Sequence, residues 1–564
     1  MKPQTVAYIA IAVRVFQSLA TQTFFQPDEY FQSLEVAHKA VFGYGHLTWE
    51  WTIDKPIRSI LFPALWMPVY KMLKDAGLDQ TSALIWAPKI LQGLFASLTD
   101  IAICRLSRRV LGPESVAITL VLSLFSFFHG LALVRSLSNS LETSLTAIAL
   151  SYWPLHSPPA PSFKRFLLPL LIASCACAVR PTNAILWTYL CMDTMVKFKR
   201  RGTTVVNLFS AVAATSLISL SLLIAIDTKY FGTLTFTAFN FVRTNLSPVS
   251  LFYGGNPWHY YLTQAIPILL TTTLPLFLHG VYLTVSGKGQ KGSQVDMQAL
   301  LGLTVWTVLI YSLAGHKEWR FIHPVLPVMH LFCTQSLLSI PHEGSGRPIA
   351  TSIFIKPRGF LVFLSLPAII YTTFIHGRAQ ISVLLHLRTI NTIELNSVGF
   401  LMPCHSTPLQ SYLHKPELEG GKLWALGCEP PLGIVDPSRY VDQTAAFYVS
   451  PLAYLQQYFP SIVDPSFPPS LHPTTIPGSP VPLLRPMSRR TTGSSYAHID
   501  EWQHSWPKHL VMFGVLAQKE DTKGQSVKQF LQEKGYDRVW RTWNGFEEDE
   551  KRRGGVEVWK WSSP

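Results

Sequence analysis

Length, composition and charge exclude an ordinary soluble protein. The chain has 564 residues, of which 48% are hydrophobic and only 14% are charged. Soluble domains carry roughly 25% charged residues, so much of this surface must face lipid. The net charge of +14 comes without a helix-turn-helix, zinc-finger or RNA-binding pattern. Much of the excess lies in short loops, where positive charge marks the cytosolic side of a membrane protein.

Long apolar runs predict membrane helices along the whole chain. A spanning helix needs about 20 apolar residues, and runs near this length occupy 6–25, 205–226, 262–285 and 359–375. Shorter apolar segments lie at 57–73, 82–104, 114–134, 139–156 and 166–196. The first run carries Arg14 and lacks a small-residue cleavage site, so we interpret it as a retained helix. We predict a polytopic α-helical membrane protein with about 10–12 membrane helices.

Basic loops orient these helices. The loops "KFKRR" (197–201), "KGQK" (288–291) and "KPR" (356–358) are predicted to be cytosolic. The result is a multi-span part, 1–377, whose loops 26–56 and 229–261 are lumenal.

The N-terminal half leaves two topologies open. Segment 166–196 is interrupted by Arg180-Pro181. As one kinked span, it places "RLSRR" (105–109) on the lumenal side, against the charge rule. As two short spans, it makes "RLSRR" cytosolic and requires 57–73 to be re-entrant or interfacial. Both alternatives keep 26–56 in the lumen.

The last part of the chain, 378–564, has no spanning run and is predicted to be a lumenal α/β domain. A proline-rich stretch, 464–486, is typical of a linker. Beyond it, strands are predicted for "HLVMFGVLA", "RVWRTWNG" and "VEVWKWSS", and a helix for "SVKQFLQEKG". Cys404 and Cys428 lie in this part and are able to pair if it is lumenal.

Two acidic residues, Asp28 and Glu29, directly follow the first apolar run. Apolar residues recur behind them at helical spacing, which predicts an amphipathic helix along the membrane surface. Asp28 follows Pro27, so one interpretation is that it simply caps this helix. The other is that its carboxylate is a general base, able to take a proton from an incoming hydroxyl.

The stretch "HKEWR" (316–320) places His316, Lys317 and Arg320 between two strongly apolar runs. It is either a solvated loop, with Glu318 paired to its basic neighbours, or a cluster of cations that binds a phosphate. Positive charge is disfavoured at the lumenal mouth of a bundle, and this favours the phosphate. A phosphate between spanning helices would belong to a lipid.

Two further signals are weaker. Arg180 precedes a proline kink, and intramembrane arginines are frequent functional residues. The stretch "FYGGNPWHYY" (252–261), with Tyr253, Trp258 and His259, suits a sugar-binding loop but also an interfacial aromatic belt. The cysteine spacing does not indicate zinc.

Seven stretches together resemble a known family. They are "QPDEYFQSLEVAH", "GYGHLTWEW", "SNSLET", "RPTNAILW", "FYGGNPWHYY", "HKEWRFIHPVLP" and "MPCHSTP". Their order is similar to that in the endoplasmic reticulum (ER) mannosyltransferases that use dolichyl-phosphate-mannose, glycosyltransferase family 22. "GYGHLTWEW", "FYGGNPWHYY" and the "PCHSTP" block resemble the GPI mannosyltransferase 3 branch, over about residues 20–455. The resemblance implies a GT-C fold with the active site in the first lumenal loop of an ER membrane protein.

The resemblance also implies an inverting transfer of the third, α-1,2-linked mannose to the GPI-anchor precursor. Asp28 matches the family's catalytic carboxylate, with Glu29 beside it. One base suffices for in-line attack, as in inverting hydrolases. His316, Lys317 and Arg320 match the motif that would bind the donor phosphate and stabilise the leaving dolichyl phosphate.

The remaining assignments follow from the same resemblance. Arg180 is a further candidate for binding the donor phosphate, ranked below His316, Lys317 and Arg320. Trp258, His259 and Tyr253 are candidates for binding the acceptor glycan. Cations can replace a metal at the leaving phosphate, and no DxD motif stands in a lumenal loop. We therefore expect a metal-independent enzyme without a cofactor, whose partners are the donor lipid and the mannosylated GPI lipid.

Other functions remain open from the sequence. The same chemistry on the dolichol-linked N-glycan precursor is the main rival. A lipid or solute transporter is disfavoured because the sequence has no internal repeat and its charged blocks lie at helix ends. A non-catalytic subunit is disfavoured by the intact carboxylate and cation motifs.

Overall fold

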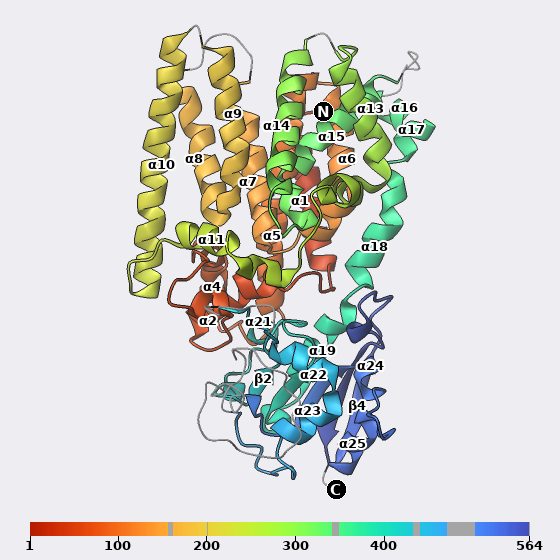
Figure 1. Ribbon diagram of the computed structural model, residues 1–564. Coiled ribbons are helices and arrows are strands. Elements are labelled where there is room, and N and C mark those ends of the chain that lie inside the picture. The colour runs from red at the N-terminus through yellow and green to blue at the C-terminus, as the bar shows by residue number, and fades with distance from the viewer. Residues whose placement is uncertain are drawn as a thin grey trace.

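The computed structural model describes residues 1–155, 162–199, 201–290, 292–340, 349–432, 440–470 and 502–562. Arg200 and Lys291 of two basic loops lie outside these ranges, as do residues 471–486 of the proline-rich stretch. Figure 1 shows a tall helical bundle with the N-terminus near one end and a sheet domain attached to the other end.

Six helical segments of the described chain are long and apolar enough to span a membrane. They are Ala83–Leu111 (α5), Gly202–Phe231 (α10), Tyr261–Val285 (η6 to α13), Gln294–Ser312 (α14), Trp319–Leu338 (η8 and α15) and Pro357–Thr389 (α17 to α19). Five other helices stand in the same bundle: Pro3–Ala20 (α1), Ser115–Leu124 (α6), Ser138–Tyr152 (α7), Phe163–Val179 (α8) and Ala184–Lys197 (α9). The protein is therefore a multi-pass membrane protein, in which six described segments meet the length and apolarity of a span and five further helices pack beside them.

Close packing of α1 on α5 explains how a charged residue is accommodated inside the bundle. Arg14 donates from Nε to Asp100 Oδ2 at 2.7 Å, and both side chains are fully buried. A Cβ at Gly93 would lie 2.7 Å from the Cα of Val15, so only glycine allows the two helices to approach so closely. The pair supplies the counter-charge that an intramembrane arginine requires.

The structure shows how the ambiguous segments of the N-terminal half fold. Segment 166–196 forms two helices, α8 and α9, that separate at Arg180, where the backbone is extended before Pro181. Arg108 of "RLSRR" donates to the carbonyl of Met1 at 3.1 Å, so this basic stretch lies at the N-terminal end of the bundle. Segment 57–73 forms turns, a short 3₁₀ helix and the start of α4 (Met67–Asp75), below the bundle in Figure 1. Segment 166–196 is therefore two helices rather than one kinked helix, and segment 57–73 does not form a spanning helix, as the two-span alternative requires.

The C-terminal part contains a five-stranded sheet in the order β2-β1-β3-β5-β4. Its strands are Val398–Leu401 (β1), Leu423–Ala425 (β2), His509–Phe513 (β3), Tyr536–Thr542 (β4) and Val556–Trp561 (β5). β1 pairs in parallel with β2 and β3, whereas β5 is antiparallel to β3 and β4. The three strands predicted from the sequence are present, although the first ends at Phe513 and its last four predicted residues form the helix α24 (Gly514–Ala517). The predicted helix is also present, as Val527–Glu533 (α25), and it begins with a capping box at Ser526.

Short helices complete the described fold. They are Glu35–Phe42 (α2), Trp49–Thr52 (α3), Thr237–Asn245 (α11), Ile349–Phe354 (α16), Thr392–Leu395 (α20), Gln410–Leu413 (α21), Gln443–Val449 (α22), Pro451–Tyr458 (α23) and Gly514–Ala517 (α24).

The helix predicted to lie on the membrane surface is instead buried between the two parts. Every residue from Tyr30 to His38 is buried, in η1 (Tyr30–Leu34) and the first half of α2. Glu35 Oε1 accepts from the backbone N–H groups of Leu409 and Ser411, at 2.7 and 3.1 Å. The prediction of a helix was correct but the prediction of an amphipathic surface helix was wrong, because polar and apolar residues alike are enclosed by protein.

Candidate active site

A cavity of about 620 Å³ lies where the bundle meets the sheet domain. We call it the polar cavity. Its acidic, basic and histidine lining residues are Asp28, Glu50, Arg58, Arg180, His316, Lys317, Glu318, Arg320, His405 and Arg552. Residues from the first loop, from "HKEWR" and from the C-terminal part therefore surround one space.

Arg320 joins the two sequence motifs directly. Its Nη1 donates to Asp28 Oδ2 at 2.6 Å, across 292 residues of sequence. Its Nε and Nη2 donate to Glu318 at 2.6 and 2.9 Å, a two-point pairing that fixes the plane of the guanidinium. In the described chain the Asp28 side chain caps no helix, since the helix that follows it has no side-chain cap bond. The interpretation of Asp28 as a cap is therefore not supported.

His316 and Lys317 hold the surrounding loops together. His316 Nδ1 donates to the Gly254 carbonyl at 2.8 Å, and Nε2 lies 3.2 Å from Glu318 Oε1. The hydrogen bond to Glu318 raises the pKa of His316, which favours its protonated form. Lys317 donates to the Asn256 carbonyl at 2.8 Å, and the Asn256 amide returns a bond of 2.8 Å to the Lys317 carbonyl. Both residues line the polar cavity and also fix the loop that contains Tyr253.

Three other candidates from the sequence do not reach the polar cavity. Glu29 is buried and lies 3.1 Å from Arg135, on the bundle side. Burial raises the pKa of Glu29, although Arg135 opposes the shift. Trp258 is 70% exposed and, like His259, stands outside the lining; of the acceptor candidates, only Tyr253 lines it.

Arg180 does line the polar cavity, as a buried cation with its own counter-charge. Its Nε lies 3.2 Å from Glu142 Oε2, and its guanidinium lies over the ring of Phe321, 5.1 Å from the centroid. The Arg320 guanidinium lies 5.8 Å from the same ring. Arg180 and Arg320 therefore approach the polar cavity around one aromatic side chain.

The sequence did not predict the pair of Arg58 and Glu50. Arg58 donates from Nε and Nη2 to Glu50 Oε1, at 3.0 and 2.9 Å. Gln32 adds a bond of 3.2 Å to the same carboxylate. Glu50 stands in "GYGHLTWEW", a stretch that carried the family resemblance, but its position in the sequence gave no indication of its partner.

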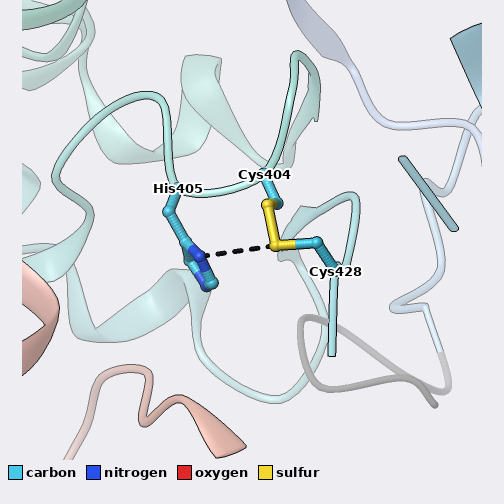
Figure 2. A group of neighbouring side chains, drawn as sticks. All are labelled: Cys404, His405 and Cys428. Atoms are coloured by element: carbon cyan, nitrogen blue, oxygen red, sulfur yellow. Dashed lines mark hydrogen bonds between the residues drawn. A yellow bond between two sulfur atoms is a disulfide. The ribbon is translucent and has the colours of Figure 1, made fainter. Parts of the chain in front are cut away.

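The C-terminal part supplies another wall, with Cys404, His405 and Cys428 (Figure 2). The two cysteines form a disulfide with a Cα–Cα distance of 5.9 Å, as the sequence allowed. The His405 Nδ1 lies 3.6 Å from the Cys428 sulfur. Reduced, the three side chains are close enough to hold a metal ion, but the sulfurs are bonded to each other here.

The chain is similar to known glycosyltransferases in sequence and in fold. Residues 5–414 match the Alg9-like mannosyltransferase family. The chain is 36% identical to "GPI mannosyltransferase 3" of Yarrowia lipolytica, over 98% of this chain and 96% of that protein. It is 35% identical to "GPI alpha-1,2-mannosyltransferase 3" of Homo sapiens, over 80% of this chain and 76% of that protein. The expected resemblance is confirmed, and with the Yarrowia protein it extends beyond residue 455.

Among solved structures, ArnT from Cupriavidus metallidurans bound to undecaprenyl phosphate has a similar fold. The TM-score is 0.53 at 11% identity, over 79% of this chain and 88% of that chain. This likeness shows the fold, which is of the predicted GT-C type. The match over residues 5–414 also covers both motifs that meet at the polar cavity. The chain is therefore a membrane-embedded glycosyltransferase that belongs to the Alg9-like mannosyltransferase family.

Proposed function

We propose that this enzyme transfers the third, α-1,2-linked mannose from dolichyl-phosphate-mannose to the GPI-anchor precursor in the ER lumen. The names of its relatives, GPI mannosyltransferase 3 and GPI alpha-1,2-mannosyltransferase 3, support the acceptor and the linkage. The ion pair between Asp28 and Arg320 is the observation that carries the proposal, because it brings a base and a phosphate-binding cation into one cavity.

In the mechanism that we propose, Asp28 is the base and Arg320 binds the donor phosphate. A phosphate that enters beside Arg320 competes with Asp28 for its guanidinium, while Glu318 keeps the guanidinium in place. Asp28 is then free to accept a proton from the acceptor hydroxyl. Donor binding would in this way both neutralise the phosphate and release the base.

The transfer then needs one displacement. The acceptor oxygen attacks the anomeric carbon of the mannose, its proton passes to Asp28, and the bond to the phosphate oxygen breaks. A β-linked donor gives an α-linked product, so the reaction inverts. Arg320, Lys317 and protonated His316 are placed to stabilise the negative charge on the leaving dolichyl phosphate. Because these cations can perform this task, we propose that no metal is required.

An apolar groove supports a lipid-linked donor. It has a volume of about 470 Å³ and is lined by α8, α9 and α10. Pro181 lines this groove, and its neighbour Arg180 lines the polar cavity. A hydrocarbon chain in the groove would therefore place its phosphate near the cations of the polar cavity. ArnT, whose fold is similar, was solved with a lipid of this kind, undecaprenyl phosphate.

The test compares two acceptors. Membranes that contain this protein receive labelled dolichyl-phosphate-mannose with either a two-mannose GPI lipid or an N-glycan lipid intermediate. We expect label on the GPI lipid only, and we expect membranes with Asp28→Asn to lose it at equal protein level. Transfer to the N-glycan intermediate instead would assign the enzyme to the rival pathway.

A further inference from the structure

We infer that His405 binds a hydroxyl of the acceptor glycan, so that the sheet domain forms the acceptor side of the active site. The inference rests on the proposed function and adds to it a residue that determines acceptor affinity. Four features of the described residues support it: the position of His405 in the sheet, its backbone, its ring contacts and its free nitrogen.

His405 follows the carboxyl end of a parallel strand. β1 ends at Leu401 and β2 ends at Ala425, and the two strands are parallel neighbours. Cys404, His405 and Cys428 come a few residues after these ends. Open α/β sheets bind ligands in the crevice outside the carboxyl ends of their strands. In this protein that edge of the sheet faces the polar cavity.

The backbone of His405 is held in an unfavourable conformation. Its φ is +54°, in the left-handed region that residues with a side chain rarely adopt. The disulfide between the preceding residue, Cys404, and Cys428 restrains this loop (Figure 2). Strain of this kind is concentrated at functional sites, where the surrounding structure maintains it.

The ring of His405 lies beside the turn that bears the proposed base. Its centroid is 4.5 Å from that of Phe31, three residues after Asp28. Burial lowers the pKa of His405 to about 4, against the opposing effect of Asp28, so the imidazole is neutral at physiological pH. A neutral imidazole hydrogen-bonds to a sugar hydroxyl without attracting the donor phosphate.

One nitrogen of this ring is available to a ligand. Nδ1 faces the Cys428 sulfur at 3.6 Å. In the described part of the chain, Nε2 has no hydrogen-bond partner, and the residue lines the polar cavity. The lining of the polar cavity therefore includes both Asp28 and a histidine whose Nε2 is unpaired among the described residues.

Steady-state kinetics of the purified full-length protein test the inference. Initial rates are measured against a synthetic two-mannose GPI lipid at saturating dolichyl-phosphate-mannose, and then with the roles of the two substrates exchanged. We expect His405→Ala to raise the acceptor KM by about three- to tenfold, the size of one neutral hydrogen bond, and to leave the donor KM unchanged. His405→Gln keeps a polar group at similar reach and should restore most of the affinity.

A matched control separates this effect from a packing defect. His46 stacks near His405, with ring centroids 6.4 Å apart, but does not line the polar cavity. His46→Ala should leave both KM values unchanged. If His405→Ala leaves the acceptor KM unchanged, or raises both KM values equally, the inference is wrong. If wild-type protein transfers no mannose to this lipid, the proposed function itself fails.

A second measurement on the wild-type protein requires no variant to fold. Diethyl pyrocarbonate modifies accessible histidines, and peptide mass spectrometry reads each site. We expect the two-mannose GPI lipid to protect His405 but not His259, which lies outside the polar cavity. Equal modification of His405 with and without the lipid would contradict the inference.

Discussion

The two walls of the polar cavity differ in the number of charged side chains that they present. The bundle wall contains Arg58, Arg180 and Arg320, each paired with a carboxylate. The sheet wall presents a disulfide, the neutral ring of His405 and one cation, Arg552, which pairs with Asp549 of the same part. Several paired cations suit a phosphate that arrives on a lipid, whereas a neutral imidazole suits a sugar hydroxyl. If the proposed function is correct, donor and acceptor would be recognised by different parts of the fold.

The strongest test of the bundle wall is the loss of the proposed base. Asp28→Asn keeps the shape of the side chain but cannot accept a proton, so we expect the transfer rate to fall by about 10²–10⁴-fold. Arg320 retains its bonds to Glu318 in this variant, so the thermal midpoint should change little. If the Asp28→Asn variant transferred mannose at the wild-type rate, the carboxylate would have no chemical role.

Arg320→Lys tests the phosphate-binding group. Lysine keeps the charge but loses the two-point pairing with Glu318, so its ammonium is not held in a fixed plane. We expect kcat to fall by about 10²-fold and the donor KM to rise, with the acceptor KM unchanged. An effect on the acceptor KM alone would reverse the assignment of the two walls.

Glu29→Gln distinguishes the two neighbouring carboxylates. It leaves the buried Arg135 guanidinium without its counter-charge, so we expect a loss of about 3 kcal/mol in stability, seen as a lower thermal midpoint in detergent. The folded fraction should keep its kcat. A large loss of kcat without a change in midpoint would indicate that Glu29 takes part in the chemistry.

A smaller, pH-dependent effect is expected at His316. Its hydrogen bond to Glu318 raises its pKa in the folded protein above the ordinary value of 6.5. The contribution of this hydrogen bond to the stability of the fold is therefore complete below about pH 6.5. It disappears as the pH rises through the pKa of His316 in the folded protein. His316→Gln should lower the thermal midpoint at about pH 5.5 more than at pH 8.5. The corresponding loss in the free energy of unfolding should be less than about 1 kcal/mol, because the site is partly solvated. An equal effect at both pH values would show that His316 is not protonated in the fold.

The smallest effect is expected at Trp258. This side chain is 70% exposed and lies outside the polar cavity, so Trp258→Ala should change kcat/KM by less than about twofold. Tyr253→Ala, at a residue that lines the polar cavity, should raise the acceptor KM. A larger effect at Trp258 than at Tyr253 would mean that the acceptor binds along the outer surface.

The sequence predicted that Asp28 and Arg320 lie on one side of the membrane for a clear physical reason, and the family resemblance implied that they share one active site. Apolar runs and basic loops determine on which side of the membrane each motif lies. Both motifs were placed on one side by this rule, and the structure brings them to 2.6 Å. The same rule could not predict in which direction each neighbouring side chain points. Glu29, the residue after Asp28, faces Arg135 rather than the polar cavity.

Short elements and distant partners were the features that the sequence could not reveal. β1 and β2 have four and three residues, too few for an alternating pattern. Because β1 and β2 were missed, the approach of His405 to the polar cavity was missed as well. The pairing of Arg58 with Glu50 depends on how one loop folds back on itself.

A cryo-electron microscopy structure of the Asp28→Asn variant with dolichyl-phosphate-mannose would be the most direct test. We expect a phosphate oxygen about 2.7–2.9 Å from the Arg320 guanidinium, with the anomeric carbon of the mannose facing residue 28. A phosphate bound away from Arg320, or a mannose that does not reach residue 28, would contradict the proposal that these two motifs form one active site.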